Sequence, residues 1–552
     1  MRLREAGPRG TEARAVLASG LAILGLVLSQ FAWVRPTNFG GYDEWLIFWL
    51  SSKGLVSQPH ANRPLNLIWT VPGWWLSPDR ILGYHVLHVL YLALSGLAVC
   101  WLVRRLLPGD PLLAHLAGVF AACWAPSDMG RLSSVQMSMY SGSTFGSLAA
   151  VVLLVESWRR GSRVVLVLSV LLAWATVRGY EATLPALVVA VLAIRPGHGG
   201  PMASRALWAA GWTGGLLIAD GAVIVPLVAG SAEPTYQGEV WGGMDLHLGR
   251  ILARLARQYS LHLTPALAPG RDEIRSAAAA LSGAVFLLGF SLAPGLRSEG
   301  GDGRRSRLAT IAAAGLVMAG LGYGTVVLSA AQVGATRMQF LSAPGIALFL
   351  AAVIRLLAGV APARWRRGLT VLLATWVAAV AGGRTQAMQR AWDGISAYPS
   401  QRDTLEQLTT LAPDLEPGTL VILVDESRSW PTTFGFRHAV ELLYGGRATG
   451  YVWGAWDLLY PTEVRAEGVT TVPWPSLQRS WGERTSFHPY GSLVVVRLDR
   501  QRRLSLAEAW PPELPAPAGG ASYAPARRIL PLRREIRERA LLVPPSWPGR
   551  PL

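Results

Sequence analysis

The sequence has few charged residues for its length. Only 15% of its 552 residues are charged, 51% are hydrophobic, and the mean hydropathy is +0.32. An ordinary soluble protein of this size carries about 25% charged residues, so the composition excludes that class. The apolar residues instead form repeated runs of about 17–23 positions, and helices of that length cross a bilayer core. The composition therefore predicts a polytopic membrane protein.

Cysteine and the common catalytic motifs are also scarce. The two cysteines, Cys100 and Cys123, both lie inside apolar runs, which excludes a disulfide framework and a zinc-binding spacing. We expect both to be small buried hydrophobic residues. The sequence contains no P-loop, no G-x-G-x-x-G that opens a βαβ unit, no G-x-S-x-G and no H-E-x-x-H. The enzyme classes that depend on these motifs are therefore unsupported.

Lysine is almost absent, because Lys53 is the only lysine among the 51 basic residues. This bias is typical of a GC-rich bacterial genome. The formal net charge of +17 could indicate a nucleic-acid partner. However, the arginines cluster in short loops between apolar runs, where they orient membrane helices. We therefore predict no nucleic-acid partner.

The apolar runs predict about eleven transmembrane helices. The first, Ala15–Val34, follows a basic segment and lacks a small-residue cleavage site, so we expect an uncleaved helix with its N-terminus in the cytoplasm. The remaining runs lie near Tyr84–Val103, Leu112–Trp124, Ser143–Val155, Val164–Thr176, Ala182–Ile194, Ala206–Val228, Ala277–Leu292, Leu308–Ser329, Phe340–Leu357 and Thr370–Ala381.

The positions of the arginines agree with one topology. If the N-terminus is cytoplasmic, alternate short loops face the cytoplasm, and these are the arginine-rich ones. They carry Arg104-Arg105, Arg159-Arg160-Arg163, Arg195 and Arg205, Arg297 with Arg304-Arg305-Arg307, and Arg364-Arg366-Arg367. An odd number of spans places the C-terminal region outside. We predict a multi-pass protein of the bacterial cytoplasmic (inner) membrane with an extracytoplasmic C-terminal domain.

Two of the predicted outside loops are long, at about 35–83 and 231–275. In the second loop, Leu248, Leu252 and Leu255 recur with helical spacing opposite Arg250 and Arg254. This pattern predicts an amphipathic helix on the membrane surface.

The apolar runs stop after residue 382. Thr419–Val424 and Ser492–Val496 are short apolar runs typical of buried strands, and Arg437–Leu443 suggests a helix. From about residue 512 the chain is rich in Pro, Ala and Arg. We therefore expect an all-α transmembrane module over 1–382, a small α/β domain over 383–511, and a poorly ordered tail over 512–552.

The first outside loop holds two adjacent carboxylates, Asp43 and Glu44, next to Trp45. Either acid could act as a general base toward an acceptor hydroxyl, with a divalent cation held by the other as one option. The alternative is an ordinary acidic pair at the start of an interfacial helix, where it suits the helix dipole.

Arg63 follows Asn62 and precedes a proline in the same loop. Its guanidinium could bind a lipid-linked phosphate through two hydrogen bonds, or it could anchor a helix end among lipid headgroups. Arg337, just before a predicted span, is a second candidate phosphate contact.

Three further polar residues lie beside apolar runs. Glu181 sits in a very short connection between two spans, where a carboxylate needs water, a ligand or a partner, and Arg178 is the nearest partner in sequence. Asp128 lies near Arg131 in another outside loop. His85 and His88 share one helix face, which favours packing and hydrogen bonding over a metal site, since no third ligand is visible. We therefore predict no certain metal site.

These residues carry a family resemblance. The order Tyr42-Asp43-Glu44, Arg63-Pro64-Leu65, Gly83-Tyr84-His85 and Gly179–Pro185 resembles that of GT-C membrane glycosyltransferases. Within that superfamily the chain is most similar to the transmembrane part of the protein O-mannosyltransferase-like proteins that carry C-terminal TPR repeats. Three features depart from that pattern: Ala125-Pro126-Ser127-Asp128 replaces a His-Pro-rich segment, Tyr180 replaces a lysine, and no TPR repeats follow.

The resemblance implies a fold, an activity and partners. It implies a GT-C-like helical fold and transfer of a sugar, with inversion, from a polyprenyl-phosphate donor to an extracytoplasmic glycan or protein acceptor. It further implies that Asp43 acts as the base, that Glu44 supports the acceptor or a cation, and that Arg63 and Arg337 stabilise the departing phosphate.

Two other functions compete with this one. A transporter or flippase for lipid-linked saccharides would place ionisable residues at the bilayer midplane and repeat its fold in two halves. An inactive relative that serves as a scaffold is the other alternative.

Overall fold

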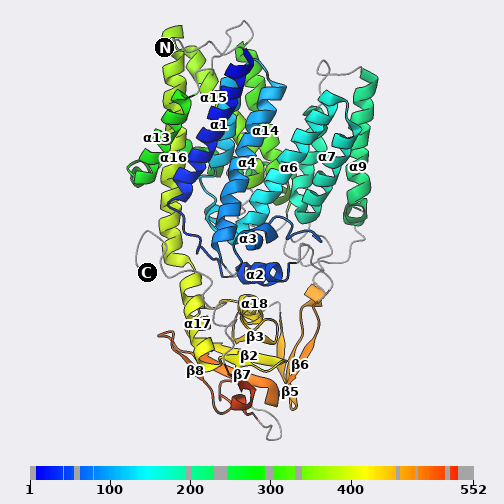
Figure 1. The fold of residues 1–552 in the computed structure, drawn as a ribbon, viewed down its shortest axis with the longest axis vertical. Coiled ribbons are helices and arrows are strands. Elements are labelled where there is room, and N and C mark those ends of the chain that lie inside the picture. Colours follow the sequence, from blue (N-terminus) through cyan, green and yellow to red (C-terminus); the bar gives the residue numbers. More distant parts are fainter. Residues whose placement is uncertain are drawn as a thin grey trace.

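The structure of the chain is a computed structural model. It describes residues 8–41, 43–54, 63–78, 80–193, 202–228, 245–292, 304–329, 339–455, 460–475, 477–478, 483–515 and 523–531. Two parts follow one another along the long axis, a helical bundle that contains the N-terminus and a smaller region of strands and helices (Figure 1).

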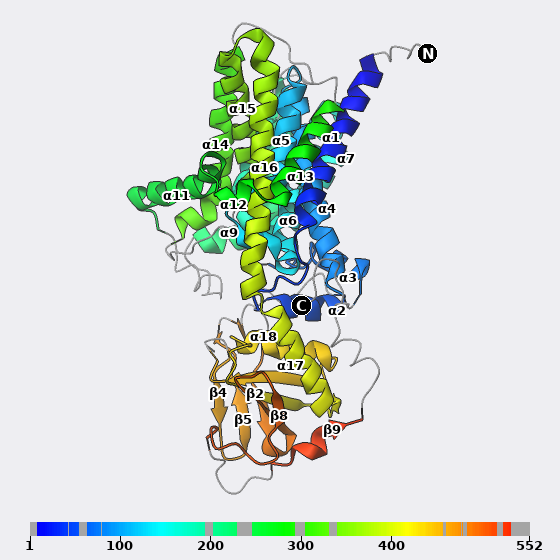
Figure 2. The same ribbon diagram turned by 90° about the vertical axis from the view of Figure 1, so that its left-hand side faces the viewer.

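The bundle consists of long apolar helices that lie roughly along one axis (Figures 1 and 2). Their bounds are α1 (Pro8–Phe31), α4 (Leu82–Leu106), α5 (Pro111–Cys123), α6 (Ser134–Arg160), α7 (Arg163–Gly179), α9 (Met202–Val228), α13 (Ala277–Ser291), α14 (Arg304–Leu328), α15 (Gln339–Val360) and α16 (Ala363–Ile395).

Within the described residues, 5 helices are long and apolar enough to cross a membrane: Leu82–Leu106, Ser134–Arg160, Arg305–Gly324, Gln339–Val360 and one within Ala363–Leu411. Four shorter apolar helices accompany them, at Ala15–Phe31, Pro111–Cys123, Glu181–Ala193 and Ala277–Ser291. The chain is therefore a multi-pass helical membrane protein, and the total of eleven spans stays a prediction.

The span predicted at Ala182–Ile194 differs from a regular helix. It consists of η2 (Glu181–Thr183), α8 (Leu184–Val189) and η3 (Ala190–Ala193), two tight 3₁₀ turns on either side of a short α-helix. At thirteen residues this segment is shorter than the roughly 20 that a transmembrane helix needs.

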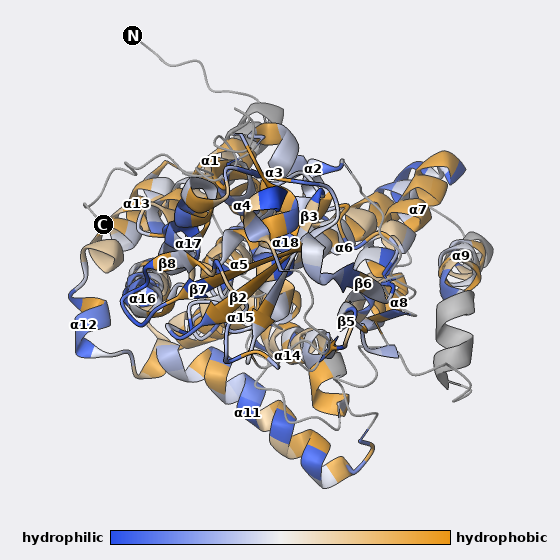
Figure 3. Ribbon diagram, turned by 90° about the horizontal axis from the view of Figure 1, so that it is seen from below, coloured by the Kyte–Doolittle hydropathy of each residue, from blue (hydrophilic) through white to orange (hydrophobic). Residues whose placement is uncertain are grey.

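The two long predicted loops contain further helices. The first holds α2 (Glu44–Ser52) and α3 (Val71–Leu76), which lie between the bundle and the C-terminal region (Figure 1). The second holds α11 (Leu248–Leu267) and α12 (Arg271–Ile274). The predicted helix in this loop is therefore confirmed. It runs across the bundle axis and carries mixed hydrophilic and hydrophobic residues (Figures 2 and 3), and its place on a membrane surface stays a prediction.

The last helix of the bundle is much longer than its apolar stretch. The sequence predicts a span over Thr370–Ala381, whereas α16 continues to Ile395 and passes residue 382 without a break. Its polar half is held by side-chain bonds: Arg384 donates to the Pro126 carbonyl at 2.8 Å and pairs with Glu273 at 2.6 Å, while Gln389 exchanges hydrogen bonds with Asn38. These contacts satisfy the polar side chains, so the helix continues beyond the hydrophobic segment.

A mixed sheet forms the centre of the C-terminal region, in the strand order β3-β2-β7-β8. The strands β2 (Thr419–Asp425), β3 (Ala448–Trp453) and β7 (Leu493–Leu498) are parallel, and β8 (Leu504–Leu506) is antiparallel to β7. Helix α17 (Tyr398–Leu411) precedes the sheet, and α18 (Thr433–Leu443) connects β2 with β3. The two strands and the helix predicted from sequence in this region are therefore confirmed.

Two smaller sheets complete the region. An antiparallel meander consists of β4 (Thr462–Val464), β5 (Gly468–Thr471) and β6 (Ser486–Pro489). Near the C-terminus, η6 (Pro525–Arg528) leads into β9 (Ile529–Leu530), which pairs with β1 (Asp414–Leu415). Residues 523–531 fall within the tail that the sequence predicts to be poorly ordered, and here they form a turn and a strand because β1 offers an edge to pair with.

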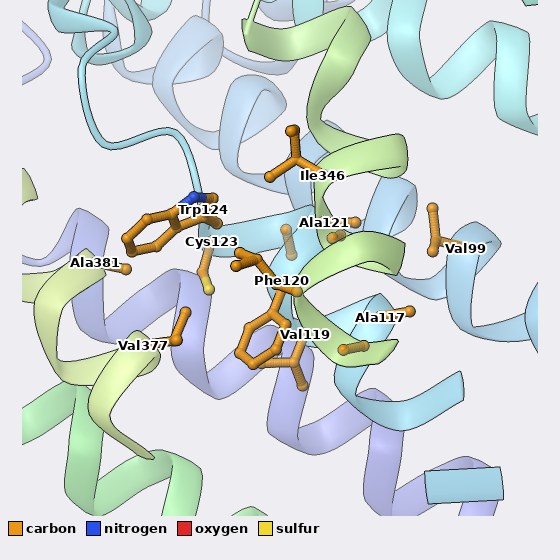
Figure 4. Packing of buried hydrophobic residues seen from close by; sticks show 14 of the residues in the cluster. Val99, Ala117, Val119, Phe120, Ala121, Cys123, Trp124, Ile346, Val377 and Ala381 are labelled. Atoms are coloured by element: carbon orange, nitrogen blue, oxygen red, sulfur yellow. The ribbon is translucent and has the colours of Figure 1, made fainter. Parts of the chain in front are cut away.

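The core of the bundle is built around α5. Its end packs Phe120, Cys123 and Trp124 against Val377 and Ala381 of α16 (Figure 4). The indole N–H of Trp124 donates to the His262 carbonyl at 3.0 Å, so this buried ring also has its polar atom satisfied. Cys100 and Cys123 are both free and buried, which confirms the sequence-based expectation.

We predict that Gly345→Ala destabilises the bundle. A Cβ at Gly345 would lie 2.5 Å from the Gly315 carbonyl oxygen and closer still to the Ala319 amide, both backbone atoms of α14 that cannot rotate away. We expect the thermal unfolding midpoint of the purified protein to fall by about 2–6 °C.

Gly359→Ala is the matched control on the same helix, because nothing lies within 4 Å of its added Cβ. Its midpoint should stay unchanged or rise slightly. Equal midpoints for the two variants would contradict the close approach of α14 and α15.

Candidate functional site

Helix α2 is packed between the bundle and the C-terminal region. On one side its aromatic residues contact Tyr84 of α4, with Phe48 edge-on to it at 5.1 Å. On the other side the ring centres of Trp45 and Trp430 are 6.1 Å apart. The indole N–H of Trp45 donates to the Gln401 side-chain oxygen at 2.7 Å. The sequence EWLIFWLSS is apolar nearly all round, which suits a helix that is buried on both faces.

The two adjacent acids have different environments. Glu44 is fully buried, and its Oε1 accepts hydrogen bonds from the Gly40 amide at 2.7 Å and the Ser133 hydroxyl at 3.3 Å. This carboxylate ties the start of α2 to the chain before it and to the start of α6. These contacts hold the start of α2, and the catalytic role of Glu44 expected from sequence stays a prediction.

Asp43 occupies the N-cap position of α2, but its side chain does not cap the helix. Instead the carboxylate accepts a hydrogen bond from the Gln136 side-chain amide at 2.8 Å, and the residue is only partly buried. Gln136 lies in the first turns of α6. Of the two acids, Asp43 is therefore the one that a ligand can reach.

Arg63 and Glu181 form a two-pronged ion pair. The Arg63 Nε and Nη2 atoms donate to the two Glu181 carboxylate oxygens at 2.6 and 2.5 Å. The guanidinium also lies 5.1 Å from the Tyr180 ring centre. Burial alone would lower the pKa of Arg63, but the Glu181 carboxylate outweighs it and raises that pKa above its ordinary value. Arg63 is therefore a permanently charged group.

Helix α6 brings the Asp43 carboxylate and the ion pair together. Gln136 contacts Asp43, and Tyr140, one turn further along, packs edge-on against Tyr180 with ring centres 4.9 Å apart. Residues four apart on a helix are neighbours on one face, about 5–6 Å apart. A single face of α6 thus joins Asp43 to Tyr180, which in turn contacts Arg63.

His85 is buried, and its Nδ1 lies 2.8 Å from the Ser134 hydroxyl. His88 accepts from the Ser141 hydroxyl at Nδ1 and donates from Nε2 to the Arg131 carbonyl. Both histidines hold α4 against the α5–α6 connection, which agrees with the packing interpretation. Among the described residues, no group of three His, Cys, Asp or Glu side chains could hold a metal ion.

Asp128 and Arg131 are both buried in the connection between α5 and α6. Arg131 donates to the carbonyls of Cys123 and Ala122 at 2.7 and 2.6 Å. These carbonyls close the end of α5, where a cation is favourable. Burial lowers the pKa of Arg131 to about 10, with Cys123 and Asp128 opposing the shift. The contacts of Arg131 therefore indicate that this pair stabilises the connection.

Two of the residues expected from sequence, Asn62 and Arg337, lie outside the described residues, as does Tyr42. The structure links Asp43 to the Arg63–Glu181 pair only indirectly, through side chains of α6 and through Tyr180. Glu44, His85 and Asp128 are buried.

The sequence also suggested that Arg178 pairs with Glu181. The ion pair forms instead with Arg63, which is 118 positions away. The Nε and Nη1 atoms of Arg178 are buried, and no hydrogen-bond partner for them exists among the described residues. Its charge acts on Asp220 of α9, whose carboxylate is also buried. An acid within a predicted span is a recognisable signal of function that the sequence analysis missed.

Gln136 was missed for a different reason. The sequence predicts the span at Ser143, whereas α6 begins at Ser134. The segment SVQMSMYS is too polar to be recognised as part of a transmembrane helix, yet its polar residues contact the site. Polar residues that continue an apolar helix are the signal that could have found it.

We predict a favourable coupling between Arg63 and Glu181. In a double-mutant cycle with Arg63→Gln and Glu181→Gln, the coupling free energy should be about 1–3 kcal/mol, because the pair is charge-assisted, two-pronged and mostly buried. The readout is the free energy of unfolding from denaturant titration in mixed micelles.

The exposed pair Arg465–Glu463 is the control, with side chains 55% and 57% exposed. Its coupling should stay below about 0.5 kcal/mol. A coupling for Arg63 and Glu181 as small as that of the control would show that the pair does not stabilise the fold.

Comparison with known proteins gives a limited result. No model of a protein family and no curated protein matches the chain. The solved structures similar to it include ArnT from Cupriavidus metallidurans bound to undecaprenyl phosphate, with 14% identity, a TM-score of 0.34, and 78% of this chain and 85% of that chain covered. The apo state of ArnT has 17% identity, a TM-score of 0.29, and coverage of 76% and 83%. Similarity at this level assigns no activity, so the functional argument rests on the residues of the site.

Proposed function

We propose that the protein is a GT-C-like membrane glycosyltransferase that moves a sugar from a polyprenyl-phosphate donor to an acceptor hydroxyl, with inversion. The observation that supports the proposal is the chain of contacts along one face of α6 that links a partly exposed carboxylate, Asp43, to a charged guanidinium, Arg63. The reaction needs one group that removes a proton and one that stabilises a leaving phosphate.

Asp43 is the proposed base. It accepts the proton of the acceptor hydroxyl while the hydroxyl oxygen forms a bond to the anomeric carbon. The bond between that carbon and the phosphate oxygen breaks on the opposite side, so the configuration inverts. The Gln136 amide donates to one carboxylate oxygen and thereby orients the other toward the acceptor. Phosphate is a good leaving group, so the reaction does not require a strong general acid.

Arg63 is the proposed first phosphate contact. Glu181 holds its Nε and Nη2 atoms, which fixes the plane of the guanidinium, and the positive charge of this group would stabilise a phosphate oxygen. Arg178 is a second cation three residues before Glu181, with buried N–H groups that lack a partner among the described residues. Arg337 keeps the phosphate-binding role that the sequence suggests. Two or three positive charges suit the charge that develops on the departing phosphate.

The proposal includes the orientation of the protein in the membrane and a role for each of its two parts. The site lies at the end of the bundle opposite the N-terminus, next to the C-terminal region (Figure 1). With a cytoplasmic N-terminus, this end faces the extracytoplasmic side of the bacterial inner membrane. There a module over 1–382 binds the lipid-linked donor, and the domain over 383–511 covers the site and selects the acceptor.

We predict that Asp43→Asn lowers the rate of sugar transfer at least about 100-fold, because an amide cannot accept the proton. The Gln136 bond can still form to the asparagine oxygen, so the thermal unfolding midpoint should stay unchanged. The assay uses purified protein in liposomes with a polyprenyl-phosphate hexose and follows cleavage of the sugar–phosphate bond.

Asp272→Asn is the matched control, since Asp272 is exposed and lies on α12, away from Asp43. It should keep full activity. Full activity of Asp43→Asn would remove Asp43 as the base. Movement of the saccharide across the bilayer without bond cleavage would support a transporter instead.

A further inference from the structure

A pocket lies at the end of α2 opposite Asp43. It has a volume of about 310 Å³, within the range of sites for small ligands. Trp49 and Lys53 of α2 form one wall, and the amino ends of β2 and β3, the end of α18 and His488 of β6 form the others. The pocket is therefore made jointly by the first outside loop and the C-terminal region.

Helix α18 runs beside α2 and sets the position of this pocket. At the start of both helices, a Cβ on Gly435 would lie 2.8 Å from the Gly41 carbonyl oxygen. At their far ends, Gly446 has φ +78° and a Cβ there would lie 2.9 Å from the Trp49 ring. Glycine at 446 thus permits both the turn and the approach of Trp49. Lys53 follows Asp43 by ten residues, which corresponds to about 15 Å along a helix.

His488 supplies a hydrogen-bond acceptor to the pocket. The residue is only 8% exposed, and burial lowers the pKa of its ring, which is therefore neutral at neutral pH. Its Nδ1 lies 3.2 Å from the Gly418 carbonyl, so Nδ1 carries the proton and donates. Nε2 is then an acceptor, it is buried, and no donor for it exists among the described residues. A hydroxyl group of a ligand would satisfy it.

Lys53 supplies a positive charge that the described residues leave without an ion pair. Its ammonium lies 3.8 Å from the Trp49 ring centre, and its carbon chain follows that ring. Burial lowers the pKa of Lys53, and the nearby carboxylates of Glu441 and Glu483 oppose this shift. Three N–H donors of an ammonium remain for an anionic oxygen.

The carboxylate in the pocket wall is already neutralised. Glu441 pairs with Arg437 at 3.2 Å and with His438 at 3.0 Å, and it accepts from the Thr449 hydroxyl at 3.0 Å. Burial alone would raise the pKa of Glu441, but these three partners lower it to about 2. Arg437 is shared between Glu441 and Glu483, to which it also pairs at 3.2 Å. Arg447, another cation in the lining, pairs with Asp414 at 3.3 Å. Lys53 is therefore the lining cation that the described residues leave without an ion pair.

We propose that this pocket binds a sugar unit that carries an anionic group. The anion would contact Lys53, and a sugar hydroxyl would donate to His488. The inference rests on the proposed function, because it identifies the pocket as a subsite for a distal residue of the acceptor glycan. The acceptor is then an acidic glycan that reaches from Lys53 to Asp43.

Ligand-observed NMR titration of the full-length protein in micelles tests whether the pocket prefers an anionic sugar to a neutral one. The probes are methyl glucuronide, methyl glucoside, methyl glucoside 6-phosphate and inorganic phosphate. We expect at least one anionic glycoside to bind about tenfold or more tightly than the neutral glucoside. If methyl glucuronide binds more tightly, the anionic group of the natural ligand is a carboxylate. If methyl glucoside 6-phosphate binds more tightly, it is a phosphate.

Substitutions test whether the anionic glycosides bind in this pocket. Lys53→Gln should lose the tenfold preference, Lys53→Arg should retain most of it, and Arg500→Gln, which removes an exposed charge elsewhere, should leave it unchanged. Asp43→Asn should bind the glycosides as the unmodified protein does, so failure of the transfer reaction and failure of this subsite are distinguishable.

Four results would overturn the inference. Equal binding of neutral and anionic glycosides would exclude recognition of charge. Binding of inorganic phosphate as tight as that of the sugar phosphate would indicate a plain anion site. A preference that survives in Lys53→Gln, or no binding of any glycoside, would place the acceptor elsewhere and leave the role of Asp43 intact.

Discussion

The burial of α2 on two sides is the constraint on which the functional regions depend. On the bundle side, the Glu44 carboxylate is bound to Ser133, and on the other side the Trp45 indole is bound to Gln401. A nine-residue helix would not be stable alone in water. Because both contacts are buried and satisfied, α2 has one position, and the residues at its two ends, Asp43 and Lys53, are fixed relative to each other.

Charged groups near the bundle are stabilised in different ways. Arg63 and Glu181 neutralise each other, and Arg131 is bound by carbonyls at the end of α5. A buried charge without such partners is costly, so each of these contacts is required for the fold. Within the described residues, both carboxylate oxygens of Asp220 and the Nε and Nη1 atoms of Arg178 are buried without a hydrogen bond, and the charge of Arg178 stabilises that of Asp220.

Much of the fold could be predicted from local sequence patterns. Runs of apolar residues marked the helices of the bundle, and two short apolar runs marked the central strands β2 and β7. The patterns failed where polar residues continue an apolar helix, as at the start of α6 and the end of α16. The partner of Glu181 could not be predicted either, because Arg63 is distant in sequence and Arg178 is close. The site was found only as separate residues, and its geometry required the packing of α2 and α6.

The continuity of α16 has a mechanical consequence. At 33 residues it is about 50 Å long, whereas a bilayer core is about 30 Å thick. One stiff rod therefore passes from the hydrocarbon region to the base of the C-terminal sheet, with α17 following after a short bend. This rod holds the sheet at a constant height above the lipid surface. The separation between the apolar part of the bundle and the sheet is thus set by the length of one helix.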